Sequence, residues 1–344
     1  VSLERVERLG GDGRLLLDEA GEVHLVTLAE KLVVPVLAKL SNFVPGGGIW
    51  LNTERPEWND ANNALVGYGL SMVTLYQLRR YLDHLRQLVR SADTERMPMS
   101  TEVTQWLADI TAALSGSEPQ SPISDRDRKA LMDALGGAFS DYRSRVYASG
   151  FSGSTDVPVS DLVKLCDIAI EHLDATIRVN RRPDGLYHSY NLVRFESDGT
   201  SAAVEHLFEM LEGQVAILDS GVLSAEERAD VIDALFSSAM YRADQDSFIL
   251  YPARQLPSFL EKNVVPADAV AGNPLLSELL ARSDQSIIAV DANGDHRFNA
   301  DFSNRADLIA ALDELAKQEA WRELVAVHRD VTLATYESVF GHHG

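Results

Sequence analysis

The chain has 344 residues, of which 45% are hydrophobic and 24% are charged, and its formal net charge is −21 at pH 7. This composition supplies enough apolar material for a large core and excludes a disordered chain. The strong negative charge argues against broad nucleic-acid binding and against an anionic membrane surface, because both would repel the protein.

The first part of the chain is predicted to begin with short strands. Residues 1–28 are expected to form a small β-hairpin segment, because two short apolar stretches flank a turn that contains glycine. A short helix should follow and end near Pro35, since proline lacks the N–H that a helix interior uses. The glycines at 46–48 are expected to be flexible, and the aperiodic residues 49–63 to form a polar loop.

Helices dominate the rest of the prediction. The strongest pattern covers residues 70–89, where apolar side chains recur at helical spacing. Further helices are predicted over residues 101–114, 128–147, 160–179, 200–218, 224–241, 305–318 and 321–340. Residues 184–198 alternate and should be extended, and Asn293-Gly294 predicts a β-hairpin. We therefore expect a mainly α fold, an enclosure of paired helices with a few short β-hairpins, in a single domain over residues 1–344.

The polar loop carries the most distinctive chemistry. Its carboxylates, amides, aromatic ring and guanidinium are Glu54, Glu57, Asp60, Asn59, Asn62, Asn63, Trp58 and Arg55. Sugars are bound by such a set, because a ring packs on the C–H face of a pyranose, amides bind hydroxyls, and a carboxylic acid protonates the leaving oxygen. The alternative is a structural loop in which Asn59 or Asp60 caps the next helix.

Residues 58–67, with the sequence Trp-Asn-Asp-Ala-Asn-Asn-Ala-Leu-Val-Gly, resemble a segment of the inverting glycoside phosphorylases of the cellobiose/chitobiose phosphorylase and cyclic-glucan group. Members of that group have an (α/α) barrel of six helix pairs, so the resemblance implies an (α/α)-barrel-like helical toroid, or part of one, for this chain. The family has Asp where this chain has Glu57, and Gly-Met where it has Ala61-Asn62. The resemblance implies that Asp60 is the general acid and that Trp58 lines the sugar site.

We therefore expect a carbohydrate-active enzyme, with inverting phosphorolysis of a β-linked oligosaccharide as the first choice. Asp60 would protonate the departing oxygen, and Glu57 would raise the pKa of Asp60 or contact sugar. The expected substrate-binding residues are Trp58, Asn59, Asn62, Asn63, Glu54, Arg55, His188, Asn191, Asp244 and Gln245.

The later residues of that set come from two other polar segments. His188 and Asn191 lie in an alternating stretch of polar and aromatic residues that suits the wall of a site, with an exposed hairpin as the alternative. Asp244 and Gln245 lie in a second irregular segment, which is expected to converge with the first loop at the mouth of a barrel, with a solvated loop as the alternative.

A phosphorylase also needs cations for its phosphate nucleophile. Arg181 and Arg182, in the densest basic run of the chain, are the expected phosphate-binding residues, although arginines also suit the end of a helix. An inverting hydrolase would instead need a second carboxylate roughly 6.5–9.5 Å from the first. Its candidates are Glu54, Glu57, Glu196 and Asp244.

The remaining expectations concern cofactors, partners and location. No metal site and no cofactor are expected, and inorganic phosphate is the co-substrate of the phosphorylase interpretation. The single Cys166 and the lack of any apolar run near the roughly 18–20 residues of a membrane helix favour a cytoplasmic protein. One expected partner is an oligosaccharide. The other is a second copy of the chain or, because the chain starts at Val1, the N-terminal portion of a longer enzyme. The competing class is a non-catalytic glycan-binding or scaffold protein.

Overall fold

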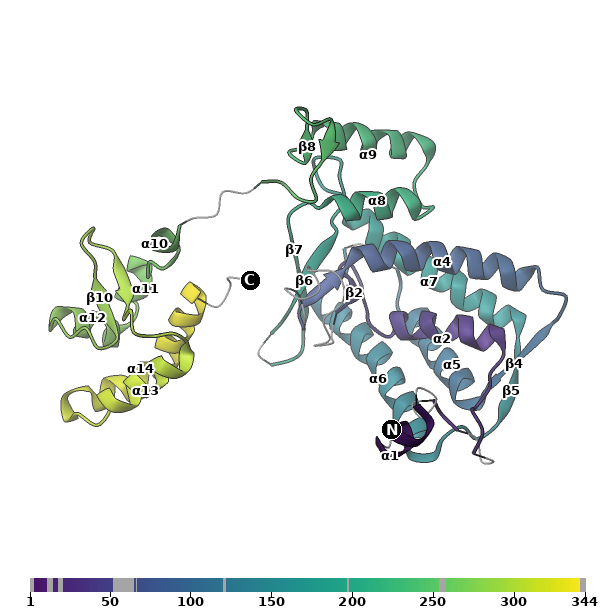
Figure 1. Cartoon of the computed structure of the whole chain (residues 1–344), viewed down its shortest axis with the longest axis horizontal. Helices are drawn as coiled ribbons and strands as arrows, with labels where there is room; N and C mark the ends of the chain where they lie inside the picture. Colours follow the sequence, from purple (N-terminus) through teal and green to yellow (C-terminus); the bar gives the residue numbers. More distant parts are fainter. Residues whose placement is uncertain are drawn as a thin grey trace. The chain divides into compact units, whose positions relative to one another are not determined.

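The computed structural model describes residues 3–10, 15–17, 21–51, 65, 67–119, 122–196, 198–253 and 258–340. These residues are mainly α-helical with short antiparallel strands, as the sequence predicts (Figure 1). The finer prediction of a helical toroid is not confirmed. The chain divides into two compact units, Val1–Ala253 and Arg254–Gly344, where the sequence analysis expects one domain. Each unit buries a separate hydrophobic cluster, which explains the division.

Unit 1 begins with α1 (Leu3–Leu9). Leu17 and Val23 then form an isolated antiparallel bridge, within the segment where the sequence analysis expects a hairpin. The next helix, α2 (Leu28–Leu40), continues through Pro35, so the predicted end at this proline is wrong. Burial of apolar side chains beyond the proline offsets the missing hydrogen bond, because tertiary packing supplies most of the stability of a helix.

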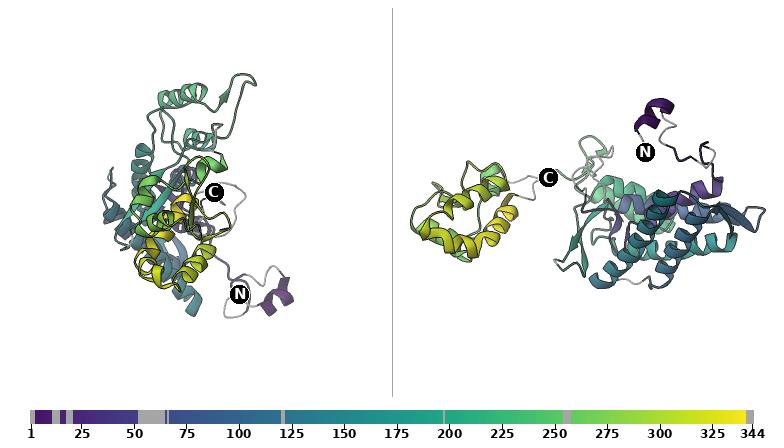
Figure 2. Two further views of the ribbon diagram at one scale, coloured as in Figure 1. Left: turned by 90° about the vertical axis from the view of Figure 1, so that its left-hand side faces the viewer. Right: turned by 90° about the horizontal axis from the view of Figure 1, so that it is seen from below.

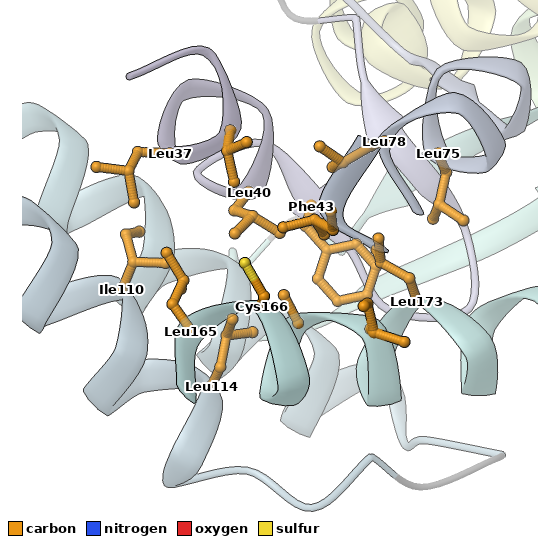
Figure 3. Packing of buried hydrophobic residues seen from close by; sticks show 14 of the residues in the cluster. Leu37, Leu40, Phe43, Leu75, Leu78, Ile110, Leu114, Leu165, Cys166 and Leu173 are labelled. Carbon is orange, nitrogen blue, oxygen red and sulfur yellow. The ribbon is translucent and has the colours of Figure 1, made fainter. Parts of the chain in front are cut away.

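Four long helices follow in unit 1. They are α4 (Met72–Arg90), α5 (Thr101–Ser115), α6 (Asp125–Ser149) and α7 (Val159–Val179). α4 packs along α7, and α5 packs along α6. Side chains from α2, α4, α5 and α7 meet around Phe43 in the core (Figure 3). The short strands β4 (Arg96–Ser100) and β5 (Ser154–Pro158) pair beside these helices.

A five-stranded antiparallel sheet lies at the end of this helical layer. Its strands, in spatial order, are β1 (Phe43–Val44), β2 (Gly48–Trp50), β3 (Gly69–Ser71), β6 (Tyr190–Phe195) and β7 (Ala202–His206). The predicted helix over residues 200–218 is therefore wrong in its first part, and only α8 (Leu211–Asp219) is helical there. Pairing along the whole of β6 outweighs the local helix propensity of the β7 residues.

Unit 1 ends with α9 (Ala225–Ser237) and the small hairpin of β8 (Tyr241–Arg242) and β9 (Ser247–Phe248). Unit 2 contains α10 (Phe259–Lys262), α11 (Ala267–Ala271), α12 (Pro274–Ala281), α13 (Arg305–Leu315) and α14 (Glu319–Phe340). In unit 2, α13 and α14 lie side by side (Figure 2). The hairpin predicted at Asn293-Gly294 is present as β10 (Ile288–Val290) and β11 (His296–Phe298). Among the described residues, no helix combines the length and apolarity that crossing a membrane requires.

Candidate functional site

The loop with the most distinctive chemistry falls outside the described residues. This applies to Glu54, Arg55, Glu57, Trp58, Asn59, Asp60, Asn62 and Asn63. The flanking residues are described, and they meet in the sheet. The Leu51 N–H donates to the Gly69 carbonyl at 2.8 Å, and the Gly67 N–H donates to the Leu51 carbonyl at 2.9 Å. The chain therefore leaves β2 and returns to β3 at the same place.

Close backbone packing fixes the point where the chain leaves β2 and returns to β3. A Cβ on Gly48, which has a φ of 131°, would lie 2.9 Å from the backbone of Ser71. A Cβ on Gly69 would lie 2.4 Å from the Cβ of Leu65. The glycines at 46–48 thus form a tight turn between β1 and β2, and the expectation of a flexible segment is wrong.

A groove of about 770 Å³ opens beside Leu51, and we call it the sheet-end groove. Its polar and aromatic lining residues are Lys39, Ser71, Thr74, Gln77, Tyr190, Glu212 and Asp219. Leu250, from the second irregular segment, also lines it, and its carbonyl accepts a 2.7 Å hydrogen bond from the Leu211 N–H. The groove therefore brings the start of the first loop and part of the second segment together.

The predicted residues of the second segment lie elsewhere. Asp244 and Gln245 sit in the turn between β8 and β9, and they are not among the residues that line the sheet-end groove. The Asp244 carboxylate accepts hydrogen bonds of 2.7 and 2.9 Å from the guanidinium of Arg242. The residue of the second segment that reaches the sheet-end groove is therefore Leu250, two residues beyond the end of β9 at Phe248.

His188 and Asn191 come together through a third residue, His206. The fully buried Asn191 donates through Nδ2 to the Gly47 carbonyl at 2.7 Å and to Oδ1 of Asn180 at 2.8 Å. Nδ1 of His206 lies 2.8 Å from Oδ1 of Asn191, and the His206 ring stacks on His188 with centroids 4.1 Å apart. In this structure the two predicted contact residues support the glycine turn and the sheet from within.

The stacked pair of His188 and His206 should make unit 1 less stable in mild acid. Burial, followed by His206 and Arg182, lowers the pKa of His188 to about 4, and burial also lowers the pKa of His206. An unfolded histidine titrates near 6.5, so between about pH 6.5 and 4 the unfolded chain binds protons that the folded chain excludes, and stability falls as the pH falls.

We expect the melting temperature to drop as the pH is lowered from about 6.5 to 4.5, a window above the ordinary pKa values of carboxylates. The variant His188→Phe keeps a ring on His206 and removes one titrating group, so its melting temperature should depend less on pH. Thermal melts of both proteins across this window test the point. Identical pH dependence in the two proteins would contradict it.

The two arginines predicted to bind phosphate differ in their surroundings. Nη2 of Arg182 lies 2.8 Å from Asp184 and 3.0 Å from Glu209, so this guanidinium already has two carboxylate partners. The side chain of Arg181 is exposed, and its backbone forms a bridge with Tyr187. Arg181 is therefore the more accessible cation of the two.

Several lining residues of the sheet-end groove were not found from the sequence. Lys39 lies in the last turn of α2, and Glu212 lies in the first turn of α8. Because the sequence predicted one helix over residues 200–218, it did not indicate that α8 begins at Leu211. Lys39 lies beside Leu51 only because of non-local packing. Within the part of the chain that the structure describes, no group of three or more His, Cys, Asp or Glu side chains is arranged to hold a metal ion.

Comparison with known protein families gives a match in unit 2. Residues 256–343 match the model described as GH149 phosphorylase insertion domain 2. No curated protein matches the chain. The match supports a glycoside phosphorylase family for this chain and does not single out the cellobiose/chitobiose phosphorylase group.

Proposed function

We propose that the chain is part of a carbohydrate-active enzyme that cleaves β-linked oligosaccharides by inverting phosphorolysis. The observation that carries the proposal is the match of residues 256–343 to a phosphorylase insertion domain. The resemblance of residues 58–67 in unit 1 to glycoside phosphorylases supports it independently, because the two segments do not overlap. In the proposal the helices of unit 1 belong to an (α/α) barrel of the whole enzyme.

Asp60 is the general acid of the proposed reaction. Its proton goes to the glycosidic oxygen as the bond from that oxygen to the anomeric carbon breaks. A phosphate oxygen forms the new bond to the anomeric carbon from the opposite face, so the products are a glycosyl phosphate and a shortened saccharide. Glu57 keeps Asp60 protonated by raising its pKa, as a nearby negative charge does.

The other loop residues bind the sugar in this proposal. The Trp58 ring packs on a pyranose face, and the polar side chains of Glu54, Arg55, Asn59, Asn62 and Asn63 bind hydroxyl groups. The sheet-end groove, which begins at Leu51, supplies the adjoining surface, with the phenol of Tyr190 and the amide of Gln77 as hydrogen-bonding groups.

Phosphate takes the exposed guanidinium of Arg181 as its first contact. Arg182 reaches the anion only after it releases Asp184 or Glu209, because both carboxylates now hold it. Lys39 lines the sheet-end groove with an exposed side chain and adds a second accessible cation. In the proposal these cations supply the positive charge that a phosphate dianion needs in an acidic protein.

A thermal-shift screen of β-linked oligosaccharides, with and without inorganic phosphate, tests this function. We expect a sugar-dependent rise in melting temperature that increases further when phosphate is present, because ligands that bind the folded state stabilise it. A rise with sugar that phosphate does not change would favour the hydrolase or glycan-binding alternative. The absence of any shift would favour the scaffold alternative.

A further inference from the structure

A second groove, of about 760 Å³, lies against helix α6, and we call it the α6 groove. Its floor includes Gly136 and Gly137, and its aromatic lining includes Trp50 and Phe195. Its polar and charged lining residues are Lys39, Ser41, Asn42, Lys129, Asp133, Ser140 and Arg143. The α6 groove shares Leu51 and Lys39 with the sheet-end groove, so both adjoin the start of the candidate loop.

The glycine pair is unexpected in the middle of a long helix. Glycine destabilises a helix interior by roughly 0.5–1 kcal/mol relative to alanine, and α6 runs without a break from Asp125 to Ser149. A Cβ built on Gly136 or Gly137 meets no atom within 4 Å, so close packing does not require glycine at either position. Neither glycine has a positive φ, so backbone conformation does not require it.

The absence of side chains at Gly136 and Gly137 keeps the groove open. Both glycines line it, and any larger residue at these positions would extend into its open space. The sequence thus accepts a less stable helix at the two positions where a side chain would fill the groove. A cost in stability that keeps a cavity open is typical of a binding site.

The aromatic lining identifies the class of ligand. Trp50 and Phe195 have ring centroids 5.6 Å apart and an interplanar angle of 56°, and Phe195 is 39% exposed. Nε1 of Trp50 donates to the Gly67 carbonyl at 3.1 Å, which fixes the indole ring on the sheet. Rigid aromatic rings beside polar side chains suit a sugar, which presents C–H faces and hydroxyl groups together.

Two of the three cations that line the groove, Lys129 and Arg143, are already engaged by neighbouring side chains. Nζ of Lys129 lies 2.6 Å from Asp133, so this ammonium is already paired with a carboxylate. The guanidinium of Arg143 lies 5.5 Å from the ring centroids of Phe139 and of Tyr147, which places it on aromatic faces. An uncharged oligosaccharide fits this part of the lining, whereas Lys39, which the two grooves share, remains an accessible cation.

We propose that the α6 groove binds an oligosaccharide. The choice of sugar as the ligand rests partly on the proposed function, whereas the glycine floor and the aromatic wall stand on the structure alone. Sugar units would lie across Gly136 and Gly137 and pack against Trp50 and Phe195.

Isothermal titration calorimetry with cellohexaose, laminarihexaose and chitohexaose tests the proposal. We expect at least one probe to bind, and Gly137→Leu to weaken its binding by about tenfold or more, equivalent to about 1.4 kcal/mol. The melting temperature of this variant should not fall, because leucine favours a helix and has open space at this position. Ser144→Leu, at an exposed position of the same helix outside the groove, is the matched control and should bind like the unchanged protein.

Phe195→Ser provides a second variant, which removes an exposed ring without filling the groove, and it should also weaken binding. Phosphate-dependent cleavage of the same probe by the unchanged protein is measured beside the titrations. If the protein does not cleave the probe but Gly137→Leu still weakens binding, the α6 groove is a sugar site and the proposed enzymatic function is wrong. If no probe binds, or if Gly137→Leu and Phe195→Ser bind like the control, the α6 groove is not a sugar site.

Discussion

Replacing Asp60 with Asn should reduce the rate of phosphate-dependent cleavage by about 10²–10⁴-fold, the usual contribution of a general acid. The asparagine keeps the size and polarity of the side chain and removes the proton that the leaving oxygen needs. The kcat of both proteins, measured with one β-linked oligosaccharide at saturating phosphate, tests this expectation.

Two comparisons separate an acid from a residue that only maintains the loop. Asp156→Asn, on an exposed stretch of β5, is the matched control and should leave kcat unchanged. An aryl glycoside whose leaving group needs no protonation should recover most of the lost rate in Asp60→Asn. If Asp60→Asn retains full activity, or if the activated substrate gives no recovery, Asp60 is not the acid.

Replacing Asn191 with Ala should lower the free energy of unfolding of unit 1 by about 3 kcal/mol, because each buried group left without a partner costs roughly 1–3 kcal/mol. The change removes the buried hydrogen bonds to Gly47 and Asn180 and the partly buried one with His206. Denaturation in urea, followed by circular dichroism, measures the loss.

Asn299→Ala is the control for this variant. Asn299 is only partly buried, and its side chain donates to the Gln285 carbonyl at 3.0 Å in unit 2, where water can reach the groups that the change leaves unpaired, so its replacement should change stability less. Phosphate-dependent activity should fall with the folded fraction of Asn191→Ala. A variant as stable as the unchanged protein would show that the network around Asn191 does not hold the glycine turn in place.

Local signals in the sequence predicted much of the fold correctly. The helix expected from residue 224 begins there as α9, where Ser224 and Glu227 form a capping box whose two hydrogen bonds need only residues three apart. The long helix expected over residues 70–89 is α4, with Ser71 as its N-cap. The Asn293-Gly294 hairpin is present for the same reason, because a turn signal acts between neighbouring residues.

The five-stranded sheet could not be predicted in this way. β3 pairs with β6 between Leu70 and Asn191, which lie far apart in the chain, and β2 and β3 are each only three residues long. The residues of β7 have a composition that a helix tolerates, and only the neighbouring β6 makes them extended. Non-local pairing decides strand formation, and no local pattern records it.

In the candidate site, too, local motifs could be found from the sequence and non-local contacts could not. The sequence motif around Asp60 identified a class of chemistry, but it carried no information about the groove walls. Lys39 and Glu212 come from two different helices and line one groove only because the chain folds around the sheet end. The buried roles of His188 and Asn191 also depend on partners, Gly47 and His206, that no spacing in the sequence connects to them.

The anomeric configuration of the product is the most direct test of an inverting phosphorylase. The protein is incubated with a β-linked oligosaccharide and inorganic phosphate, and the products are identified by phosphorus and proton NMR. The proposed reaction yields an α-glycosyl phosphate and no product when phosphate is omitted. A β-glycosyl phosphate, or free sugar released at the same rate without phosphate, would contradict it.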